Sequence, residues 1–156
     1  IVTVVNEILF VNVRIWLYIG RDDVDKSTLG GLGLPTGFNK GYYIRPTLFT
    51  DVDNDMSIAQ NEVFGPVLSI IPFENEDHAV ELANDTPYGL AAYIQSTDDN
   101  RIERVSRRLR AGVVNVNGHA GDYDVPFGGY NQSGNGREAG PLGFHEYLET
   151  KAITKE

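Results

Sequence analysis

The order of apolar and amphipathic segments between residues 67 and 116 is the feature that most constrains the fold of this chain. Mainly apolar runs predict buried strands over residues 67–73, 90–95 and 113–116. The segments between them predict helices over residues 75–84 and 98–110, the second with Ile102, Val105 and Leu109 on one face. Because strands that alternate with helices are joined by right-handed crossovers, this order indicates a mostly parallel α/β sheet. Ligands of such sheets usually bind beyond the carboxyl ends of the strands.

Polar and glycine residues near the ends of the predicted helices are suited to their free backbone groups. Asn75 can cap the helix that runs through residue 84, and acidic residues follow it in the first turn. Asp55 can accept from the first amides of a short helix over residues 56–61. Gly112 suits the end of the helix over residues 98–110, because glycine is free to adopt a left-handed backbone.

Glycine and proline divide the rest of the chain. The first twenty residues are apolar with polar interruptions, which predicts a buried strand or helix and disfavours a membrane span. Residues 22–39 form a glycine-rich linker, and residues 42–49 are extended, with Pro46 confining them to an edge or a bend. Residues 118–143 carry eight glycines, which fits either an active-site wall or an ordinary surface connection. Residues 147–154 predict a final strand.

Composition disfavours several classes of function. A net charge of -9 argues against binding to phosphate backbones. The arginines of residues 101–110 alternate with acids, and the spacing of Glu103 and Arg107 favours an ion pair on a solvated helix face. The histidines lack metal-ligand spacing, Ser133 lacks the first glycine of a nucleophile elbow, and no phosphate loop or dinucleotide fingerprint occurs. The chain has no cysteine, which excludes a thiol nucleophile of its own and suits a soluble protein of the cytoplasm.

The segment Asn-Glu-Val-Phe-Gly-Pro-Val at 61–67 is an unusual way to end a helix. The carboxylate of Glu62 can accept hydrogen bonds from both hydroxyls of a ribose, and the ring of Phe64 can pack on a flat heterocycle. The simpler alternative is that Phe64 belongs to the core and Glu62 is a surface helix residue. The physical chemistry of these residues leaves both interpretations open.

Residues 41–154 resemble the C-terminal part of the aldehyde dehydrogenase superfamily. The resemblance rests on six motifs in family order and spacing: Gly-Tyr-Tyr-Ile-Arg-Pro-Thr-Leu-Phe at 41–49, Glu-Val-Phe-Gly-Pro-Val at 62–67, Asn-Asp-Thr-Pro-Tyr-Gly-Leu-Ala at 84–91, Gly-Val-Val-Asn-Val-Asn at 112–117, Pro-Phe-Gly-Gly-Tyr at 126–130 and Ser-Gly-Asn-Gly-Arg-Glu at 133–138. It implies three parts: a poorly matching N-terminal segment with the linker (1–40), the C-terminal part of the catalytic domain (41–145), and an oligomerisation strand with a tail (146–156). The implied fold class is α/β, a partial catalytic domain with a mostly parallel sheet.

The resemblance also implies roles for individual residues. Glu62 would bind the nicotinamide-side ribose of NAD or NADP, and Phe64 would help to position the nicotinamide. Phe127 would line the aldehyde pocket. The family's structural turn beneath that pocket would comprise Gly128, Gly129, Ser133, Gly134, Gly136 and Arg137. Residues 146–154 would be the strand through which the family forms homo-oligomers.

The family's nucleophilic cysteine, general-base glutamate and cofactor domain precede the resembling region. We therefore expect a C-terminal fragment of an enzyme that oxidises an aldehyde to a carboxylic acid with NAD or NADP, and we expect this chain alone to be inactive. Two alternatives belong to other classes. One is a non-catalytic interaction module that pairs through its terminal strand, and the other is a free-standing α/β ligand-binding domain.

Overall fold

A computed structural model of the chain describes residues 2–5, 8–14, 27–119 and 121–156, and side chains are described from residue 29 onward. Parts of three expected segments lie outside the described residues, namely residues 1, 6–7 and 15–20 of the apolar N-terminal run, residues 22–26 of the linker and residue 120 of the glycine-rich segment 118–143.

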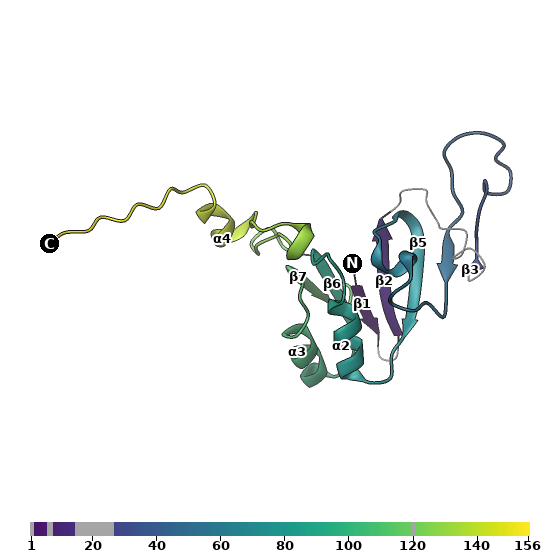
Figure 1. Cartoon of the computed structure of the whole chain (residues 1–156), viewed down its shortest axis with the longest axis horizontal. Helices are drawn as coiled ribbons and strands as arrows, with labels where there is room; N and C mark the ends of the chain where they lie inside the picture. Colours follow the sequence, from purple (N-terminus) through teal and green to yellow (C-terminus); the bar gives the residue numbers. More distant parts are fainter. Residues whose placement is uncertain (1, 6–7, 15–26, 120) are drawn as a thin grey trace.

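The described strands form one sheet in the order β3-β4-β5-β2-β1-β6-β7 (Figure 1). Their bounds are β1 Val2–Val5, β2 Ile8–Arg14, β3 Ser27–Leu29, β4 Thr47–Phe49, β5 Phe64–Pro72, β6 Ala91–Gln95 and β7 Val113–Val116. The pairs β4–β5, β1–β6 and β6–β7 are parallel, whereas β1–β2, β2–β5 and β3–β4 are antiparallel. The expected α/β fold with parallel strands is confirmed, but only three of the six described pairs are parallel, because β2 and β1 lie between β5 and β6 and β3 pairs antiparallel with β4. The linker also contributes a strand, because β3 pairs with β4.

Strand β5 begins three residues earlier than the sequence predicts, and Pro66 lies inside it. The register with β2 shifts between Asn12 and Arg14, opposite the part of β5 that contains Pro66. Because proline has no N–H to donate, a bulge of this kind is where a strand accommodates it.

The helices are α1 Ser57–Gln60, α2 Glu76–Asn84, α3 Asp99–Ser106 and α4 Gly140–His145, with a 3-10 turn, η2, over Asn131–Ser133. The Asn75 cap is confirmed, since its side-chain oxygen accepts from the amide of His78 at 3.0 Å. The Asp55 cap is wrong, because Met56 is the N-cap of α1 and no side chain caps the amino end of that helix.

Helix α3 ends four residues earlier than expected, because its last turn tightens. The amide of Arg108 donates to the carbonyl of Val105 at 3.0 Å, a bond to the third residue back. The side chain of Asn84 then accepts from the amide of Arg110 at 2.7 Å and donates to the carbonyl of Arg108 at 2.9 Å. The two bonds join the carboxyl ends of α2 and α3, and Leu109 is still buried.

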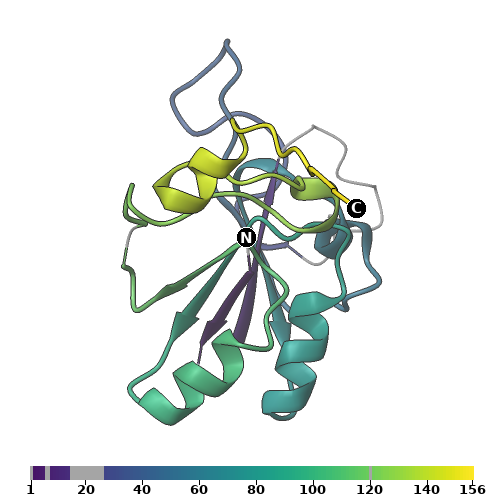
Figure 2. The same ribbon diagram turned by 90° about the vertical axis from the view of Figure 1, so that its left-hand side faces the viewer.

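Helices α2 and α3 lie side by side (Figure 2) and are joined by ion pairs. Arg104 donates twice to the carboxylate of Glu76, each at 2.7 Å, and Arg108 lies 2.7 Å from Asp77. The bond from Arg104 holds the pKa of the Glu76 carboxyl below its usual range, against the opposing effect of burial. The expected pair of Glu103 and Arg107 is confirmed at 2.8 Å.

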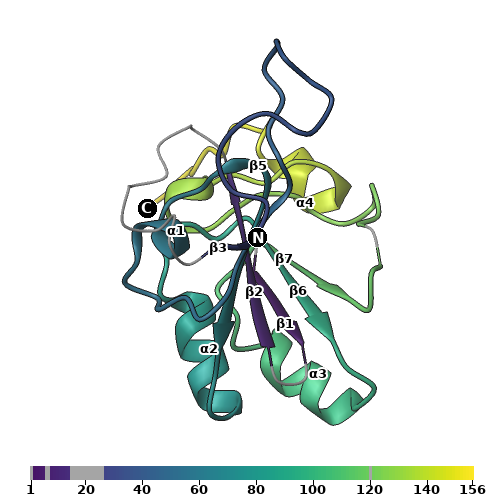
Figure 3. The same ribbon diagram turned by 90° about the vertical axis from the view of Figure 1, so that its right-hand side faces the viewer.

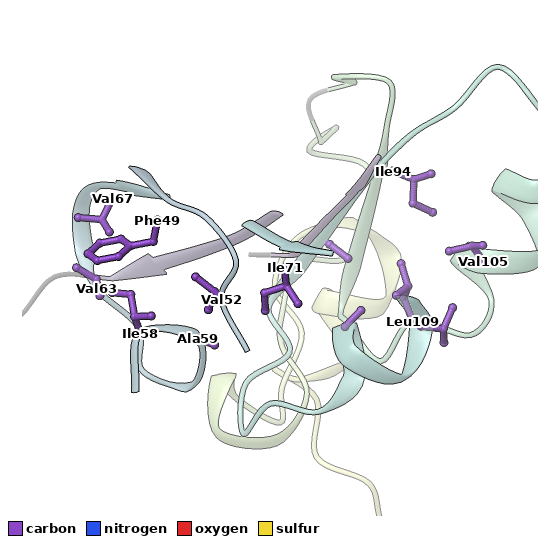
Figure 4. Close-up of a cluster of buried hydrophobic side chains, with 13 residues drawn as sticks. Phe49, Val52, Ile58, Ala59, Val63, Val67, Ile71, Ile94, Val105 and Leu109 are labelled. Carbon is purple, nitrogen blue, oxygen red and sulfur yellow. The ribbon is translucent and has the colours of Figure 1, made fainter. Parts of the chain in front are cut away.

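The hydrophobic core lies where the sheet meets α1, α2 and α3 (Figure 4). Its members include Phe49, Val52, Ile58, Val63, Val67, Ile71, Val80, Ile94, Val105 and Leu109. Figure 4 shows Phe49 and Val67 at one end of this core and Val105 and Leu109 at the other. The core therefore spans both the β4–β5 side of the sheet and the strands beneath α3.

Two segments extend from the sheet at opposite ends of the molecule. Residues 30–46, here called the β3–β4 arm, project beyond β3 and β4 (Figures 1 and 3). At the other end lie α4 and the C-terminal tail. The expected strand over residues 147–154 is wrong for the isolated chain, because the described residues after 148 belong to no strand or helix and are exposed. A strand needs a neighbour for its backbone groups, and the tail projects away from the sheet.

No described helix combines the length and the apolar character that crossing a bilayer requires.

Candidate functional site

Alternation along an extended segment decides which of the residues 62–64 face the core. Val63 is buried at 8% exposure, whereas Phe64, the first residue of β5, is 54% exposed. Glu62 is half-buried and follows the end of α1, so it is not a helix residue. Successive side chains of an extended chain point to opposite sides, and the core takes Val63. The interpretation of Phe64 as a core residue is therefore wrong.

Glu62 and Phe64 line a cavity of about 410 Å³ together with Tyr88, Arg110 and Ser133. This volume lies within the roughly 300–1,000 Å³ of typical small-molecule sites. The cavity lies at the amino ends of β5 and β6 and next to the last turns of α2 and α3.

The expectation that a ligand site lies at the carboxyl ends of the strands does not hold for Glu62 and Phe64. A separate cavity of about 460 Å³ does lie at that edge, between the ends of β5 and β6 and the first turns of α2 and α3, but it contains none of the predicted site residues.

Phe127 lies outside both cavities, in a segment held at the same end of the sheet as the first one. It forms a bridge with Glu138, in which each amide donates to the other residue's carbonyl at 2.7 Å. The residue is 48% exposed. The isolated chain thus presents Phe127 on the surface and does not bring it into one enclosed pocket with Glu62 and Phe64.

The predicted structural turn is held by hydrogen bonds to its own backbone and to the turn before β6. Arg137 donates to the carbonyls of Gly129 and Gly136 at 3.0 and 2.8 Å. The hydroxyl of Ser133 accepts from the amide of Gly89 at 3.0 Å, and Gly134 has a left-handed φ of 127°. Since the Ser133 oxygen is engaged in positioning Gly89, its role here is to join two turns.

Close backbone contacts explain why the glycines of this turn and its neighbours are needed. A Cβ on Gly112 would lie 1.5 Å from the carbonyl oxygen of Gly128, and one on Gly128 would lie 2.2 Å from that of Gly136. The carbonyl of Gly89 accepts from the amides of both Gly112 and Tyr130, at 3.0 and 2.9 Å. Gly112 has no left-handed backbone, so the expected helix-ending role is wrong. Its function is to let the 126–130 segment approach the sheet.

Sequence reasoning missed Gly89, Gly112 and Asn84 as parts of this site. The turn Thr-Pro-Tyr-Gly at 86–89 was recognisable as a turn, but nothing local shows that residues 130–133 dock on it. Asn84 carries a recognisable signal, a short amide side chain at the end of a helix.

The site offers binding groups and no nucleophile of the thiol class. Glu62 supplies a carboxylate acceptor, and Phe64 and Phe127 supply exposed aromatic faces. The whole sequence has no cysteine, and no group of three metal-ligating side chains gathers among the described residues.

The fold and the site define an α/β chain with a cavity, lined by Glu62 and Phe64, at one end of a mixed sheet. A family model described as the aldehyde dehydrogenase family matches residues 2–153. The chain belongs to the aldehyde dehydrogenase family. The matched range begins within residues 1–40, the segment for which we expected a poor match.

Individual relatives agree with this assignment. A putative aldehyde dehydrogenase of Staphylococcus saprophyticus is 44% identical over 150 residues, which cover 96% of this chain and 32% of the relative. A 3-succinoylsemialdehyde-pyridine dehydrogenase of a Pseudomonas species is 50% identical over 128 residues, which cover 82% of this chain and 27% of the relative. This chain thus spans about a third of the length of these relatives, or less.

Solved structures show the same relationship. A mutant of aldehyde dehydrogenase C (AldC) from Pseudomonas syringae, in complex with NAD+ and octanal, is 51% identical with a TM-score of 0.78, covering 82% of this chain and 26% of that one. An aldehyde dehydrogenase from Bartonella henselae is 46% identical with a TM-score of 0.76, covering 86% and 31%.

Proposed function

We propose that this chain is the C-terminal part of an NAD(P)-dependent aldehyde dehydrogenase, which oxidises an aldehyde to a carboxylic acid in the cytoplasm. The observation that carries the proposal is the pair formed by Glu62 and Phe64 on the wall of one cavity. Support also comes from the 51% identity to AldC, which was crystallised with NAD+ and octanal. Within the chain, residues 41–145 belong to the catalytic domain, and residues 146–156 form the oligomerisation strand and tail.

The described residues fit the nicotinamide-riboside half of the cofactor. The Glu62 carboxylate can accept from two neighbouring ribose hydroxyls, and the half-exposed ring of Phe64 offers a flat surface for the nicotinamide. The bound cofactor supplies a hydride acceptor. The contribution of Glu62 and Phe64 is to orient it, because catalysis gains most when reacting groups are held in near-attack geometry.

Phe127 lines the aldehyde pocket of the complete enzyme and excludes water from it. The turn of Gly128, Gly129, Ser133, Gly134, Gly136 and Arg137 holds Phe127 in place. The bonds from Arg137 and to Ser133 support this role, because they fix the loop on both sides of η2.

We propose further that the chain alone does not oxidise aldehydes. It contains no cysteine, and hydride transfer in this reaction starts from the covalent adduct that a nucleophile forms with the aldehyde. Orienting the cofactor cannot replace that adduct. Incubation with a panel of aldehydes and with NAD or NADP tests this directly. We expect no aldehyde-dependent reduction of either nucleotide, and sustained reduction by the purified chain would refute the proposal.

A second candidate function is a non-catalytic module that pairs with another copy through residues 146–154. The observation that favours it is the exposed, unpaired tail. Size-exclusion chromatography with light scattering distinguishes a paired chain from a monomer. A dimer that is lost when the chain is shortened after residue 145 supports pairing, and a monomer at high concentration argues against it.

A further inference from the structure

Two Asn-Gly sequences occur in this chain, Asn117-Gly118 and Asn135-Gly136. Asparagine is one of the chemically labile residues of proteins, because the backbone nitrogen of the next residue can attack its side-chain amide. A following glycine favours that attack, since it has no side chain to shield the nitrogen and its backbone turns freely. The two sequences share this local chemistry, and the fold treats them differently.

Asn117 is held by hydrogen bonds to its side chain and to its backbone. Its side-chain oxygen accepts from the amide of Ser96 at 3.0 Å, and its side-chain nitrogen donates to the carbonyl of Ser96 at 2.9 Å. Its own amide donates to the carbonyl of Ile94 at 2.8 Å. The bonds to Ser96 must therefore break before the nitrogen of Gly118 can attack the side-chain amide.

Asn135 is exposed and lies in a bend between η2 and α4. Within the described part of the chain, neither its side chain nor its backbone has a hydrogen bond, and the amide nitrogen of Gly136 has none either. A Cβ added to Gly136 would meet only the end of the Glu146 side chain, at 4.0 Å, so the surroundings of the attacking nitrogen are open. Nothing in these surroundings restrains the side-chain amide of Asn135.

We propose that Asn135 is a site of spontaneous deamidation in this chain and that the fold protects Asn117. The nitrogen of Gly136 bonds to the side-chain carbonyl carbon of Asn135, and ammonia leaves with the proton that this nitrogen carried. Water then opens the cyclic imide. Opening at the side-chain carbonyl leaves aspartate, and opening at the main-chain carbonyl leaves isoaspartate, whose backbone runs through the former side chain. The net change exchanges ammonia for water, with no oxidation or reduction.

The isoaspartate product alters the turn that supports Phe127. Its backbone is longer by a methylene immediately before Gly136. The carbonyl of Gly136 accepts from Arg137 at 2.8 Å and lies against Gly128, the residue that follows Phe127. A displaced Gly136 therefore loosens the backbone next to Phe127, and we expect the bridge between Phe127 and Glu138 to weaken.

The test is to incubate the full chain in mildly alkaline buffer and to follow each site by mass spectrometry. Chymotryptic peptides separate the two sites, because aromatic residues lie between them, and fragment ions assign the converted residue. We expect Asn135 to convert at least about tenfold faster than Asn117, since two hydrogen bonds must first break at Asn117. Comparable rates at the two positions overturn the proposal, and so does an unchanged amide at Asn135.

Two controls separate the effect of the fold from that of the flanking residues. In urea the bonds of Asn117 are lost, so the ratio of the two rates should fall severalfold, and an unchanged ratio refutes the protection. The variant Gly136→Ala shields the attacking nitrogen at a position with room for a Cβ and no left-handed backbone. It should keep the urea midpoint of the wild type and slow conversion of Asn135, and conversion at the wild-type rate overturns the proposal.

Amide hydrogen exchange at Phe127 and Glu138 tests the consequence for the turn. The isoaspartate form, separated by chromatography, should exchange both amides faster than the Asn135→Asp variant, which has the same charge and an ordinary backbone. Equal exchange refutes the link between this site and Phe127. None of these measurements requires aldehyde oxidation, so their outcome is independent of the proposed function.

Discussion

Replacement of Gly112 by alanine tests whether the contact between the sheet and the 126–130 segment holds the candidate site together. The new Cβ would lie 1.5 Å from the carbonyl oxygen of Gly128, and that oxygen belongs to backbone that cannot rotate away. Ordinary contact requires roughly 3.4 Å or more, so the segment has to retreat by about 2 Å.

The size of the effect follows from the bonds that such a retreat breaks. Three hydrogen bonds of 2.9 to 3.0 Å connect the turn at residues 86–89 with residues 130–133. At about 0.5–1.5 kcal/mol each, the loss of the three bonds lowers the free energy of unfolding by roughly 1.5–4.5 kcal/mol. We therefore expect the Gly112→Ala variant to lose most of the order of the turn that carries Phe127.

Urea unfolding gives the free energy, and amide hydrogen exchange at Gly89 and Tyr130 reports on the turn itself. The matched control is Gly121→Ala in the loop that follows β7, since Gly121 has no atom within 4 Å of its added Cβ and no left-handed backbone. The control should change stability by less than about 0.5 kcal/mol. If Gly112→Ala behaves like Gly121→Ala in both measurements, the close contact is not structural and the reasoning is refuted.

Three further predictions concern bonds around the site and between the helices. Ser133→Ala should cost about 1 kcal/mol in urea unfolding and speed exchange of the Gly89 amide, because its acceptor is lost; unchanged exchange would contradict this. Asn84→Ala should cost about 1–2 kcal/mol, since it removes both bonds that join the ends of α2 and α3, and a neutral effect would argue against that link. Glu76→Gln should cost about 0.5–1 kcal/mol at neutral pH, because the pair with Arg104 is partly exposed. The lowered pKa of Glu76 means that this stability is present above the unfolded-state pKa and is lost as pH falls through the folded-state pKa. The stability of the variant should therefore depend less on pH than that of the wild type in the acid range below the ordinary glutamate pKa, and equal slopes would count against the prediction.

The sequence predicts an element correctly where the residues within that element determine it. The strand at 113–116 has the predicted bounds, and Asn75 caps α2 as expected, because a short polar side chain before a helix needs only the neighbouring amides. Asp55 shows the limit of the same rule: the chain turns so that the amide of Met56 donates to the carbonyl of Asp53, and α1 begins one residue later.

Features that depend on residues far apart in the sequence could not be predicted. The sequence predicts that Gly112 ends a helix, but the position requires glycine because of the carbonyl of Gly128, sixteen residues further on. The choice between Val63 and Phe64 for the core depends on the side of the segment that meets α1 and the sheet. The strand expected over residues 147–154 needs a neighbour that the chain does not provide.

The central claim is that Glu62 and Phe64 orient the cofactor of an enzyme that is incomplete in this chain. The most direct measurement is aldehyde-dependent nucleotide reduction by a complex of this chain with the amino-terminal part of Pseudomonas syringae AldC, cut where its similarity to this chain begins. The same measurement is made on the chain alone and on the complex that contains the Glu62→Gln variant. We predict no reduction by the chain alone, reduction by the complex, and a fall in kcat/KM of about tenfold or more for Glu62→Gln, because an amide is a weaker acceptor for ribose hydroxyls than a carboxylate. Reduction by the chain alone, or a Glu62→Gln complex as active as the unmodified one, would contradict the claim.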